Sequence, residues 1–328
     1  MQEKILTLLK NGPSFVSGQR ISADLGITRA AVWKKILALR KKGFVIEAVP
    51  SKGYRLISSP DLARDVILPA ILGGLWKDLR VYDSVESTND LAMSLASKSL
   101  ISSGTVLIAD RQTRGKGRLN RIWESPGSRN IYMSMVIRPD LAPRDATMLT
   151  LLAAVAGARA VRSSCNIPVT IKWPNDLVVS DAKLGGILSE VRADPDRINI
   201  AVIGVGINVH MRPADFPEEL RGFATSVRMA AGHAVPRNEI IIQLLKEMEH
   251  WYGILVTRGK APLISAWRKE SSTLGKMVRV AIGDHSVSGV ARDIDENGML
   301  VLETPAGRRM HISTGDVSQL RQLPNTEQ

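Results

Sequence analysis

The sequence predicts an α+β multidomain fold: an N-terminal winged helix-turn-helix, a central α/β domain on a mixed sheet, and a small SH3-like β-barrel at the C-terminus. Three observations predict it. Two short helices flank a glycine turn near the N-terminus, and β-branched runs alternate with helical stretches from about residue 65 to 270. Short strands separated by turn residues then follow from about residue 274. The expected domains are residues 1–60, 65–270 and 271–328.

Composition narrows the class of protein. Of the 328 residues, 44% are hydrophobic and 23% charged, the ordinary balance of a soluble globular protein. No apolar run approaches the roughly 18 residues of a membrane span, and no signal peptide is evident. A single cysteine builds neither a disulfide framework nor a zinc cluster. We therefore expect a cytoplasmic protein with no membrane partner and no metal held by its own side chains.

The net charge of +12 is concentrated at the N-terminal end of the chain. Residues 1–60 carry eleven Lys and Arg side chains against three Asp and Glu side chains. Such an asymmetry indicates a polyanionic partner for this segment.

The same segment has the pattern of a winged helix-turn-helix. A short amphipathic helix at residues 4–10 precedes two helices, at residues 17–25 and 28–40, and Gly26 supplies the turn between them. Ser and Thr at the first positions of these two helices are good N-caps. Residues 44–57 then alternate apolar and polar around a Pro-Ser-Lys-Gly turn, as a strand–turn–strand wing does. A basic helical bundle with a solvated face is the alternative.

The last of the three helices is the expected recognition helix. It would enter the major groove of DNA, while the wing would meet phosphates. The expected DNA-binding residues are Thr28, Arg29, Ala30, Trp33 and Lys34 on the helix, with Lys52 and Arg55 on the wing.

Beyond a polar, proline-marked joint at residues 57–61, the pattern changes to strands interleaved with helices. Apolar runs such as TVLIAD, IYMSMVI and INIAVIGVGINV alternate with helical stretches such as STNDLAMSLASKSL, which predicts an α/β domain on a mixed sheet. The tail reads KMVRVAI, HSVSGVARDI, GMLVLET and RRMHI, and Asn297-Gly298 is a strong hairpin signal.

A basic, glycine-rich loop follows the TVLIAD strand and reads RQTRGKGRLNRIW over residues 111–123. Its glycines permit backbone conformations that point successive N–H groups at an anion, its basic side chains add positive charge, and its Trp offers an apolar wall. These residues are Gly115, Lys116, Gly117, Arg118, Arg121 and Trp123. The spacing excludes a Walker A loop. Taken alone, such a basic glycine-rich segment is more often a mobile surface loop than a binding site.

A second segment reads IKWPNDLVVSDAKLGGILSE over residues 171–190. Lys172 comes at the end of a strand, and Asn175 and Asp176 suit a turn. A Lys beside an Asp at a strand end is nevertheless costly to bury without purpose. Lys183 precedes two glycines, which permit close approach of a ligand or strand. Two lysines that converge here would suit an anionic substrate.

A third segment, VIGVGINVHMRP, carries Gly204 and Gly206 within a strand and then Asn208. It is not a dinucleotide fingerprint, and a bulged strand without a functional role is as well supported here as a binding site. Residues 211–223, with two prolines and two phenylalanines, are a candidate lid. The five histidines lack metal-ligand spacing, and HExxH, CxxC and GxSxG are absent, which argues against zinc sites and hydrolase triads.

The order of these motifs resembles that of the bifunctional biotin protein ligases, which also serve as biotin operon repressors. The resemblance covers essentially the whole chain, with a helix-turn-helix in front and a small barrel behind. The matching pieces are STN at 87–89, the GKGR loop ending in Trp123, KWPND at 172–176, KLGGIL at 183–188 and GVGIN at 204–208.

The resemblance implies a two-step ligation and a second role on DNA. Biotin and ATP with Mg²⁺ would give biotinyl-5′-adenylate, and a lysine of a biotin carboxyl carrier domain of acetyl-CoA carboxylase would then attack it. The adenylate, acting as co-repressor, would favour a homodimer that binds operator DNA and represses biotin biosynthesis.

The resemblance also implies site residues. The biotin carboxylate and the α-phosphate are both anions, so cationic side chains must bring them together, and Asp176 would accept a proton from the attacking amine. The catalytic residues would be Lys172, Asp176, Lys183 and Arg118. The biotin-binding residues would be Ser87, Thr88, Asn89, Gln112, Lys116, Gly117, Arg118 and Lys183. The adenylate-binding residues would be Gly115, Arg121, Trp123, Asn175, Asn208 and Phe223.

The glycine-rich loop departs from the family pattern in two places. Lys116 stands where the family usually has Arg, which keeps the charge but not the bidentate geometry. Leu119 and Asn120 stand where the family has Arg-Gly, and Asn120 can adopt the left-handed conformation of a glycine. We expect activity to persist, with retention of the adenylate as the property affected.

Two other functions remain open. One is a transcription factor whose central domain only binds a small effector, and KWPND with Lys183 weighs against it. The other is a lipoate ligase built on the same catalytic fold, against which the KWPND and GKGR pair favours biotin.

Overall fold

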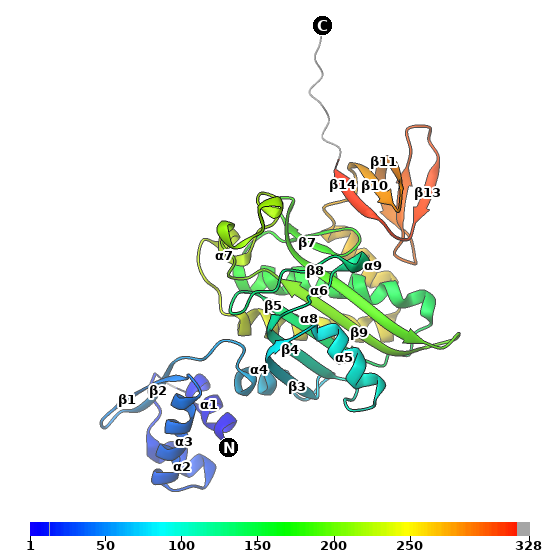
Figure 1. Ribbon diagram of the computed structural model, residues 1–328. Coiled ribbons are helices and arrows are strands. Elements are labelled where there is room, and N and C mark those ends of the chain that lie inside the picture. The colour runs from blue at the N-terminus through cyan, green and yellow to red at the C-terminus, as the bar shows by residue number, and fades with distance from the viewer. Residues whose placement is uncertain (13, 320–328) are drawn as a thin grey trace. The chain divides into compact units, whose positions relative to one another are not determined.

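The computed structural model describes residues 1–12 and 14–319 (Figure 1). The chain divides into two compact units, residues 1–72 and the residues from 73 onward. Within the described ranges, no helix is long and apolar enough to span a bilayer.

The first unit contains the predicted helix-turn-helix and wing. Ser17 Oγ accepts a hydrogen bond from Arg20 N at 3.1 Å, and Thr28 Oγ1 accepts one from Ala31 N at 3.2 Å, so both predicted N-caps form. Gly26 takes the left-handed conformation (φ 63°) that the turn requires. The elements are α1 (Gln2–Asn11), α2 (Gly18–Leu25), α3 (Arg29–Lys41), β1 (Val45–Val49), β2 (Gly53–Ser58) and α4 (Arg64–Ile71).

The second unit is built on a seven-stranded sheet with the order β3-β4-β5-β9-β8-β7-β6. β3 and β4 run parallel, and each further pair of neighbours in this order is antiparallel, so the sheet is mixed as predicted. The strands are β3 (Asp78–Val85), β4 (Thr105–Gln112), β5 (Ile131–Ile137), β6 (Thr170–Lys172), β7 (Asp176–Val179), β8 (Ala182–Ala193) and β9 (Ile198–Ile207).

Helices cover the sheet (Figure 1). α5 packs on β4, β5 and β9, where Ala92 and Ala96 meet Leu107. α6 packs on β6 to β9, with α8 and α9 outside it. Close approach is possible because a Cβ on Gly157 of α6 would already lie 2.9 Å from Leu177 Cδ1. The helices are α5 (Thr88–Ser97), α6 (Ala146–Cys165), α7 (Val227–Ala231), α8 (Arg237–Arg258) and α9 (Ala261–Glu270).

The predicted short strands of the tail form a five-stranded antiparallel sheet with the order β13-β12-β11-β10-β14. We call residues 277–319 the C-terminal β-domain. The hairpin signal Asn297-Gly298 lies in the connection between β11 and β12, at residues 295–299. The strands are β10 (Met277–Ile282), β11 (His285–Ile294), β12 (Leu300–Glu303), β13 (Arg309–Ile312) and β14 (Asp316–Gln319).

Candidate active site

A cavity of about 440 Å³ opens on one face of the seven-stranded sheet. Its walls come from the loop after β4, the turn between β6 and β7, strands β8 and β9, the 211–224 segment and the start of β14. A Cβ on Gly185 would face Leu177 on the α6 side, whereas one on Gly186 would face Trp123, 3.4 Å away. Because successive strand residues point to opposite faces, the cavity lies on the face opposite α6.

The indole of Trp123 lies over two glycines that pair across β8 and β9. A Cβ on Gly206 would be 2.8 Å from Cε2 and Nε1 of Trp123, and one on Gly186 would be 3.4 Å from its Cζ3. β9 pairs with β5 in unbroken register through Gly204 and Gly206, so these glycines serve close approach and not a bulge. Lys183 Nζ lies 5.5 Å from the Trp123 ring centroid, within cation–π range.

A buried polar cluster lies next to the two glycines under Trp123. Ser134 Oγ lies 2.7 Å from Thr88 Oγ1 and 2.6 Å from Asn89 Oδ1. Gln112 Oε1 accepts from the backbone N and the Oγ1 of Thr88, at 2.8 and 3.0 Å. Gln112 Nε2 in turn donates to Ser125 Oγ at 3.0 Å. Sequence reasoning missed both serines, although Ser134 is a lone hydroxyl in an otherwise apolar strand.

The side-chain amide of Asn89 is hydrogen-bonded within the protein. Its Nδ2 donates to Glu190 Oε2 at 2.7 Å and to a backbone carbonyl of β8 at 3.0 Å. A Cβ on Gly204 would overlap its Oδ1, so that glycine makes room for the side chain. Ser87 is buried as the N-cap of α5, where its Oγ accepts from Asp90 N at 3.3 Å. Glu190 was not expected at this site.

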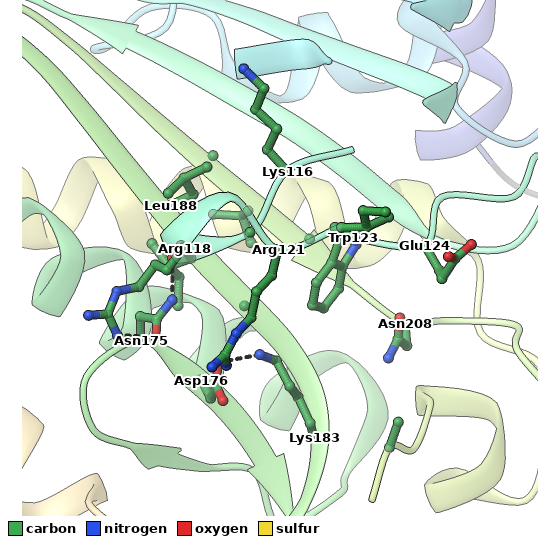
Figure 2. Close-up of a pocket in the computed structure, with 18 of the residues that line it drawn as sticks. Lys116, Arg118, Arg121, Trp123, Glu124, Asn175, Asp176, Lys183, Leu188 and Asn208 are labelled. Carbon is green, nitrogen blue, oxygen red and sulfur yellow. Dashed lines mark hydrogen bonds and ion pairs between the residues drawn. The ribbon is translucent and has the colours of Figure 1, made fainter. Parts of the chain in front are cut away.

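Cationic side chains gather at the other end of the cavity (Figure 2). Lys183 Nζ lies 2.7 Å from Asp176 Oδ1. Arg118 Nη1 lies 3.4 Å from Asn175 Oδ1. Lys172 is half-buried and has no hydrogen-bond or ion-pair partner in the described part of the chain. The Lys172 ammonium and the Arg118 guanidinium therefore face the cavity. Beside them lies Lys183, whose charge is already compensated by Asp176.

The C-terminal β-domain holds the basic loop. Arg118 Nη2 donates to Thr314 Oγ1 at 2.8 Å and Nη1 to Gly315 O at 3.4 Å, and Arg121 pairs with Asp316. Burial lowers the pKa of the Arg118 guanidinium, and the nearby carboxylate of Asp316 opposes this. No sequence signal connected these segments, because the partners lie about 195 residues apart along the chain.

Elsewhere in the loop the departures from the family pattern have local consequences. Lys116 Nζ pairs with Asp90 at 2.7 Å, and this hydrogen bond raises the pKa of the ammonium. The left-handed conformation falls on Leu119 (φ 55°), one residue before the expected Asn120. A Cβ on Gly115 would overlap a backbone oxygen of the same loop, so Gly115 closes the loop from behind and does not line the cavity.

The candidate lid, residues 211–223, contains two short 3-10 turns and is tied to β8. Lys183 N donates to Phe223 O at 2.7 Å, and Thr225 N donates to Lys183 O at 2.9 Å. Asn208 Nδ2 holds the same segment through Thr225 O at 3.1 Å. The Phe223 side chain is 74% exposed at the mouth of the cavity.

The structure thus brings together most of the residues expected at the site. The expected residues that line the cavity are Ser87, Thr88, Asn89, Gln112, Lys116, Gly117, Arg118, Arg121, Trp123, Lys172, Asn175, Asp176, Lys183, Asn208 and Phe223.

Within the described residues, no three His, Cys, Asp or Glu side chains cluster as metal ligands.

An ion pair between a buried arginine and a partly exposed aspartate lies outside the cavity lining and was also missed. Arg237, at the start of α8, donates to Asp110 Oδ1 and to Asn130 O, both at 2.8 Å. Asn130 Oδ1 accepts from Val209 N at 3.0 Å. The pair therefore joins the end of β4 to the segment that follows GVGIN.

The first unit presents the expected DNA-binding residues. Trp33 is 53% exposed, while Val32 and Ile36 of the same helix are buried. Lys52 is exposed at the tip of the wing. Arg55 lies within 2.6 Å of Glu47 and over the Phe15 ring, so part of its charge is already compensated. The exposed residues of this set are Thr28, Arg29, Ala30, Trp33, Lys34 and Lys52.

Family models match three stretches of the chain. An HTH domain matches residues 1–55, the Biotin/lipoate A/B protein ligase family matches residues 81–208, and the biotin protein ligase C terminal domain matches residues 273–319. Fold and site together define the class: a protein ligase of the biotin/lipoate type that carries a helix-turn-helix.

Individual relatives agree. The chain is 39% identical over 298 residues to the bifunctional ligase/repressor BirA of Bacillus subtilis (strain 168), covering 90% of this chain and 91% of that protein. It is 35% identical to the Escherichia coli (strain K12) protein of the same name, covering 92% and 91%. The biotin protein ligase of Aquifex aeolicus, solved with biotin and ATP, aligns with a TM-score of 0.64 at 28% identity, covering 75% and 100%. The chain belongs to the bifunctional biotin ligase/repressor family.

Proposed function

We propose that this protein condenses biotin with ATP into biotinyl-5′-adenylate, transfers the biotinyl group to a lysine of a carboxyl carrier domain, and represses transcription with the adenylate as co-repressor. The supporting observation is one cavity of about 440 Å³ in which a polar cluster meets a convergence of lysines and arginines. That volume is typical of a small-molecule site. A relative solved with biotin and ATP has the same fold.

The polar cluster suits the neutral ureido ring of biotin. A ureido group needs donors and acceptors in fixed positions, and Thr88 and Gln112, which are hydrogen-bonded to each other, offer both, with the hydroxyl of Ser87 at the start of α5 beside them. Asn89 and Ser134 hold that set in place from below. The apolar part of the ligand would lie against Trp123. Lys116, Gly117 and Arg118 would close over it.

Adenylation joins two anions, so the cationic end of the cavity does the electrostatic work. A carboxylate oxygen of biotin attacks the α-phosphorus of ATP, the bond to the β-phosphate oxygen breaks, and pyrophosphate leaves. Lys172, Lys183 and Arg118 would screen the approaching charges. Because Lys183 already pairs with Asp176 at 2.7 Å, the biotin carboxylate has to compete with that aspartate for the ammonium.

The adenylate would occupy the outer part of the cavity. Phe223 offers an exposed aromatic face to adenine, and Arg121 would hold phosphates, whereas Gly115, expected here from the sequence, lies behind the loop and only shapes it. Asn175, Asn208 and Trp123 complete this set. Mg²⁺ enters as part of the substrate, since it binds chiefly through nucleotide phosphates and needs few protein ligands.

Transfer to the carrier needs an acceptor for a proton. The lysine amine attacks the carbonyl carbon of the anhydride, the bond to the phosphate oxygen breaks, and AMP leaves. Asp176 would take the amine proton, which its position at the start of β7 allows. We assign DNA binding to residues 1–60, catalysis to 65–270 and support of the site to 271–328, of which 320–328 lie outside the described residues.

The repressor role rests on the first unit. We propose that the adenylate favours a homodimer, which sets two α3 helices on a palindromic operator. Gel-shift titrations at fixed salt should show higher affinity for operator DNA with biotin and ATP than without them. Equal affinity would contradict the coupling.

Pyrophosphate exchange into ATP, run with biotin and then with lipoate, tests the enzymatic part. We expect exchange with biotin. Exchange with lipoate alone would indicate the lipoate ligase, which the family description also allows. Exchange with neither substrate would favour a transcription factor that only senses an effector.

A further inference from the structure

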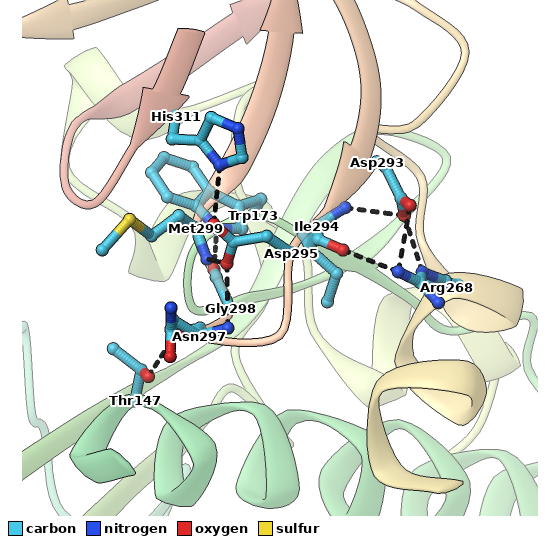
Figure 3. A network of polar contacts seen from close by, with 10 residues as sticks. All are labelled: Thr147, Trp173, Arg268, Asp293, Ile294, Asp295, Asn297, Gly298, Met299 and His311. Carbon is cyan, nitrogen blue, oxygen red and sulfur yellow. Dashed lines mark hydrogen bonds and ion pairs between the residues drawn. The ribbon is translucent and has the colours of Figure 1, made fainter. Parts of the chain in front are cut away.

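Trp173 is the buried centre of the turn that carries much of the proposed active site. It lies between Lys172 and Asn175 and is 2% exposed. Its polar atoms bond outside the seven-stranded sheet: the backbone N donates to Thr273 Oγ1 at 2.9 Å, and Nε1 donates to Gly298 O at 3.1 Å (Figure 3). The turn between β6 and β7 therefore depends on a hydrogen-bond acceptor, the Gly298 carbonyl, that the C-terminal β-domain supplies.

The conformation of residues 295–299, which we call the 295–299 turn, places that acceptor. Asp295 Oδ1 accepts from the backbone N of Asn297 and of Met299, at 2.9 and 3.0 Å. Asp295 Oδ2 lies 2.7 Å from His311 Nδ1. Gly298 adopts φ 77°, the left-handed region that favours glycine. The Asp295 carboxylate thus adds two hydrogen bonds to a turn that is also closed by two backbone bonds, from Asp295 N to Met299 O at 2.9 Å and from Gly298 N to Asp295 O at 3.0 Å.

The charge state of Asp295 suits this role. Burial raises its pKa, but the hydrogen bonds from His311, Met299 and Asn297 together outweigh burial and lower the pKa below its ordinary value. The side chain is therefore an acceptor throughout the neutral range.

The 295–299 turn is seated firmly against the helices of the α/β domain (Figure 3). Thr147 Oγ1, on α6, donates to Asn297 O at 2.7 Å. A Cβ on Gly298 would lie 3.0 Å from Leu151 Cδ1 of the same helix, so only glycine fits without displacement. Arg268 of α9 holds the strand that leads into the turn, through two bonds of 2.6 and 2.9 Å to a carboxylate of β11. Movement of the turn would therefore be transmitted to Trp173.

We propose that Asp295 is a positioning residue for adenylation. It acts through a chain of contacts: Asp295 shapes the turn, the Gly298 carbonyl holds the Trp173 indole, and Trp173 fixes its neighbours Lys172 and Asn175. Asp295 does not line the cavity and belongs to none of the motifs that define the site. The inference rests on the ligase reaction proposed above and adds a role for the C-terminal β-domain in it.

The expected size of the effect follows from geometry. A buried indole N–H that loses its acceptor carries an unmet hydrogen bond, so the ring shifts to find another partner. Displacement of a charged group by about 1 Å costs up to roughly 100-fold in rate. A partial displacement of Lys172 should then cost about 10-fold in the adenylation kcat.

A double-mutant cycle tests the chain of contacts. The variants are Asp295→Ala, Trp173→Phe and the two combined, each assayed in the full-length protein by biotin-dependent pyrophosphate exchange and by thermal unfolding. Trp173→Phe removes the indole N–H and keeps an aromatic ring. Asp295→Asn keeps the Oδ1 acceptor. Glu303→Ala is the matched control, because Glu303 is also an ion-paired carboxylate of the β-domain but its partners lie within that domain.

Each single variant should lower kcat about 10-fold, and the combination should cost little more than the larger single effect, because both act through the same hydrogen bond. Asp295→Asn should recover most of the rate, and Glu303→Ala should match the wild type. Independent effects, about 100-fold when combined, would overturn the proposal, as would wild-type kcat in Asp295→Ala.

Should Asp295→Ala not fold, Gly298→Ala takes its place in the cycle, since its Cβ would push the turn away from Leu151. The same criterion of non-additive losses then applies. A wild-type protein without biotin-dependent exchange would overturn the proposed function and this inference together. Additive losses in an active enzyme overturn the inference alone.

Discussion

Gly206→Ala is the most direct test of the geometry under Trp123. The added Cβ would sit 2.8 Å from Cε2 and Nε1 of the indole, closer than real Cβ atoms come to such neighbours. β9 is held on both sides by β5 and β8, so the strand cannot yield. The ring and the loop that carries it have to move instead.

The magnitude follows from the cost of overpacking, about 1–3 kcal/mol. If the displaced ring weakens the free energy of biotin binding by this amount, the KM for biotin rises about 5- to 150-fold, at 1.36 kcal/mol for each factor of ten. The loop relieves most of the strain in the unliganded protein. The midpoint of thermal unfolding should therefore change by only a few degrees. Pyrophosphate exchange and calorimetric titration with biotin measure the two effects.

Two alanine variants serve as controls. A Cβ on Gly186 would meet the same ring at 3.4 Å, an ordinary contact, so Gly186→Ala should raise the KM less than Gly206→Ala does. Gly253, in α8, has nothing within 4 Å, so Gly253→Ala should leave the KM unchanged and stabilise the helix by about 0.5–1 kcal/mol. The reasoning is refuted if Gly206→Ala binds biotin like the wild type, or keeps its full effect after Trp123→Ala.

Four further predictions concern single sites. Ser134→Ala should weaken biotin binding about 5-fold in calorimetric titration, because Thr88 loses its buried partner at 2.7 Å; unchanged binding would contradict this role. Lys172→Met should lower the exchange rate about 100-fold, as loss of one charge-stabilising group does, whereas Lys98→Met on the surface should not. Burial raises the pKa of the Cys165 thiol to about 11. The contribution of the neutral thiol to stability is complete below about pH 8.5, its pKa in the unfolded chain, and is lost as the pH rises toward 11. Iodoacetamide at about pH 8.5 should therefore label the thiol only after unfolding. Lys52→Ala should weaken DNA binding evenly across sequences and reduce the salt slope by about 0.9, and a sequence-selective loss would argue against a phosphate contact.

Local features of this protein were predictable because they depend on neighbours along the chain. Ser17 and Thr28 cap their helices, Gly26 takes the left-handed turn, and Lys172 ends its strand, as spacing and residue type predict. The segments that carry the site were equally visible, since glycines and lysines at strand ends have few structural uses. Asn120 is the instructive exception. The left-handed residue is Leu119, although Asn tolerates that conformation better than Leu does.

Residue patterns along the chain therefore predict the order of the domains, the mixed sheet, and the three motif segments of the cavity with their net positive charge, but not the start of β14 that joins them. Tertiary structure alone decided which side chains complete them. Thr88 meets Ser134 across 46 positions, Arg237 meets Asp110 across 127, and Trp173 finds its acceptor across 125. Such contacts depend on which strands become neighbours, in what register, and on how closely a glycine lets two backbones approach. Those outcomes belong to the packing of the whole sheet and leave no periodic signal along the chain.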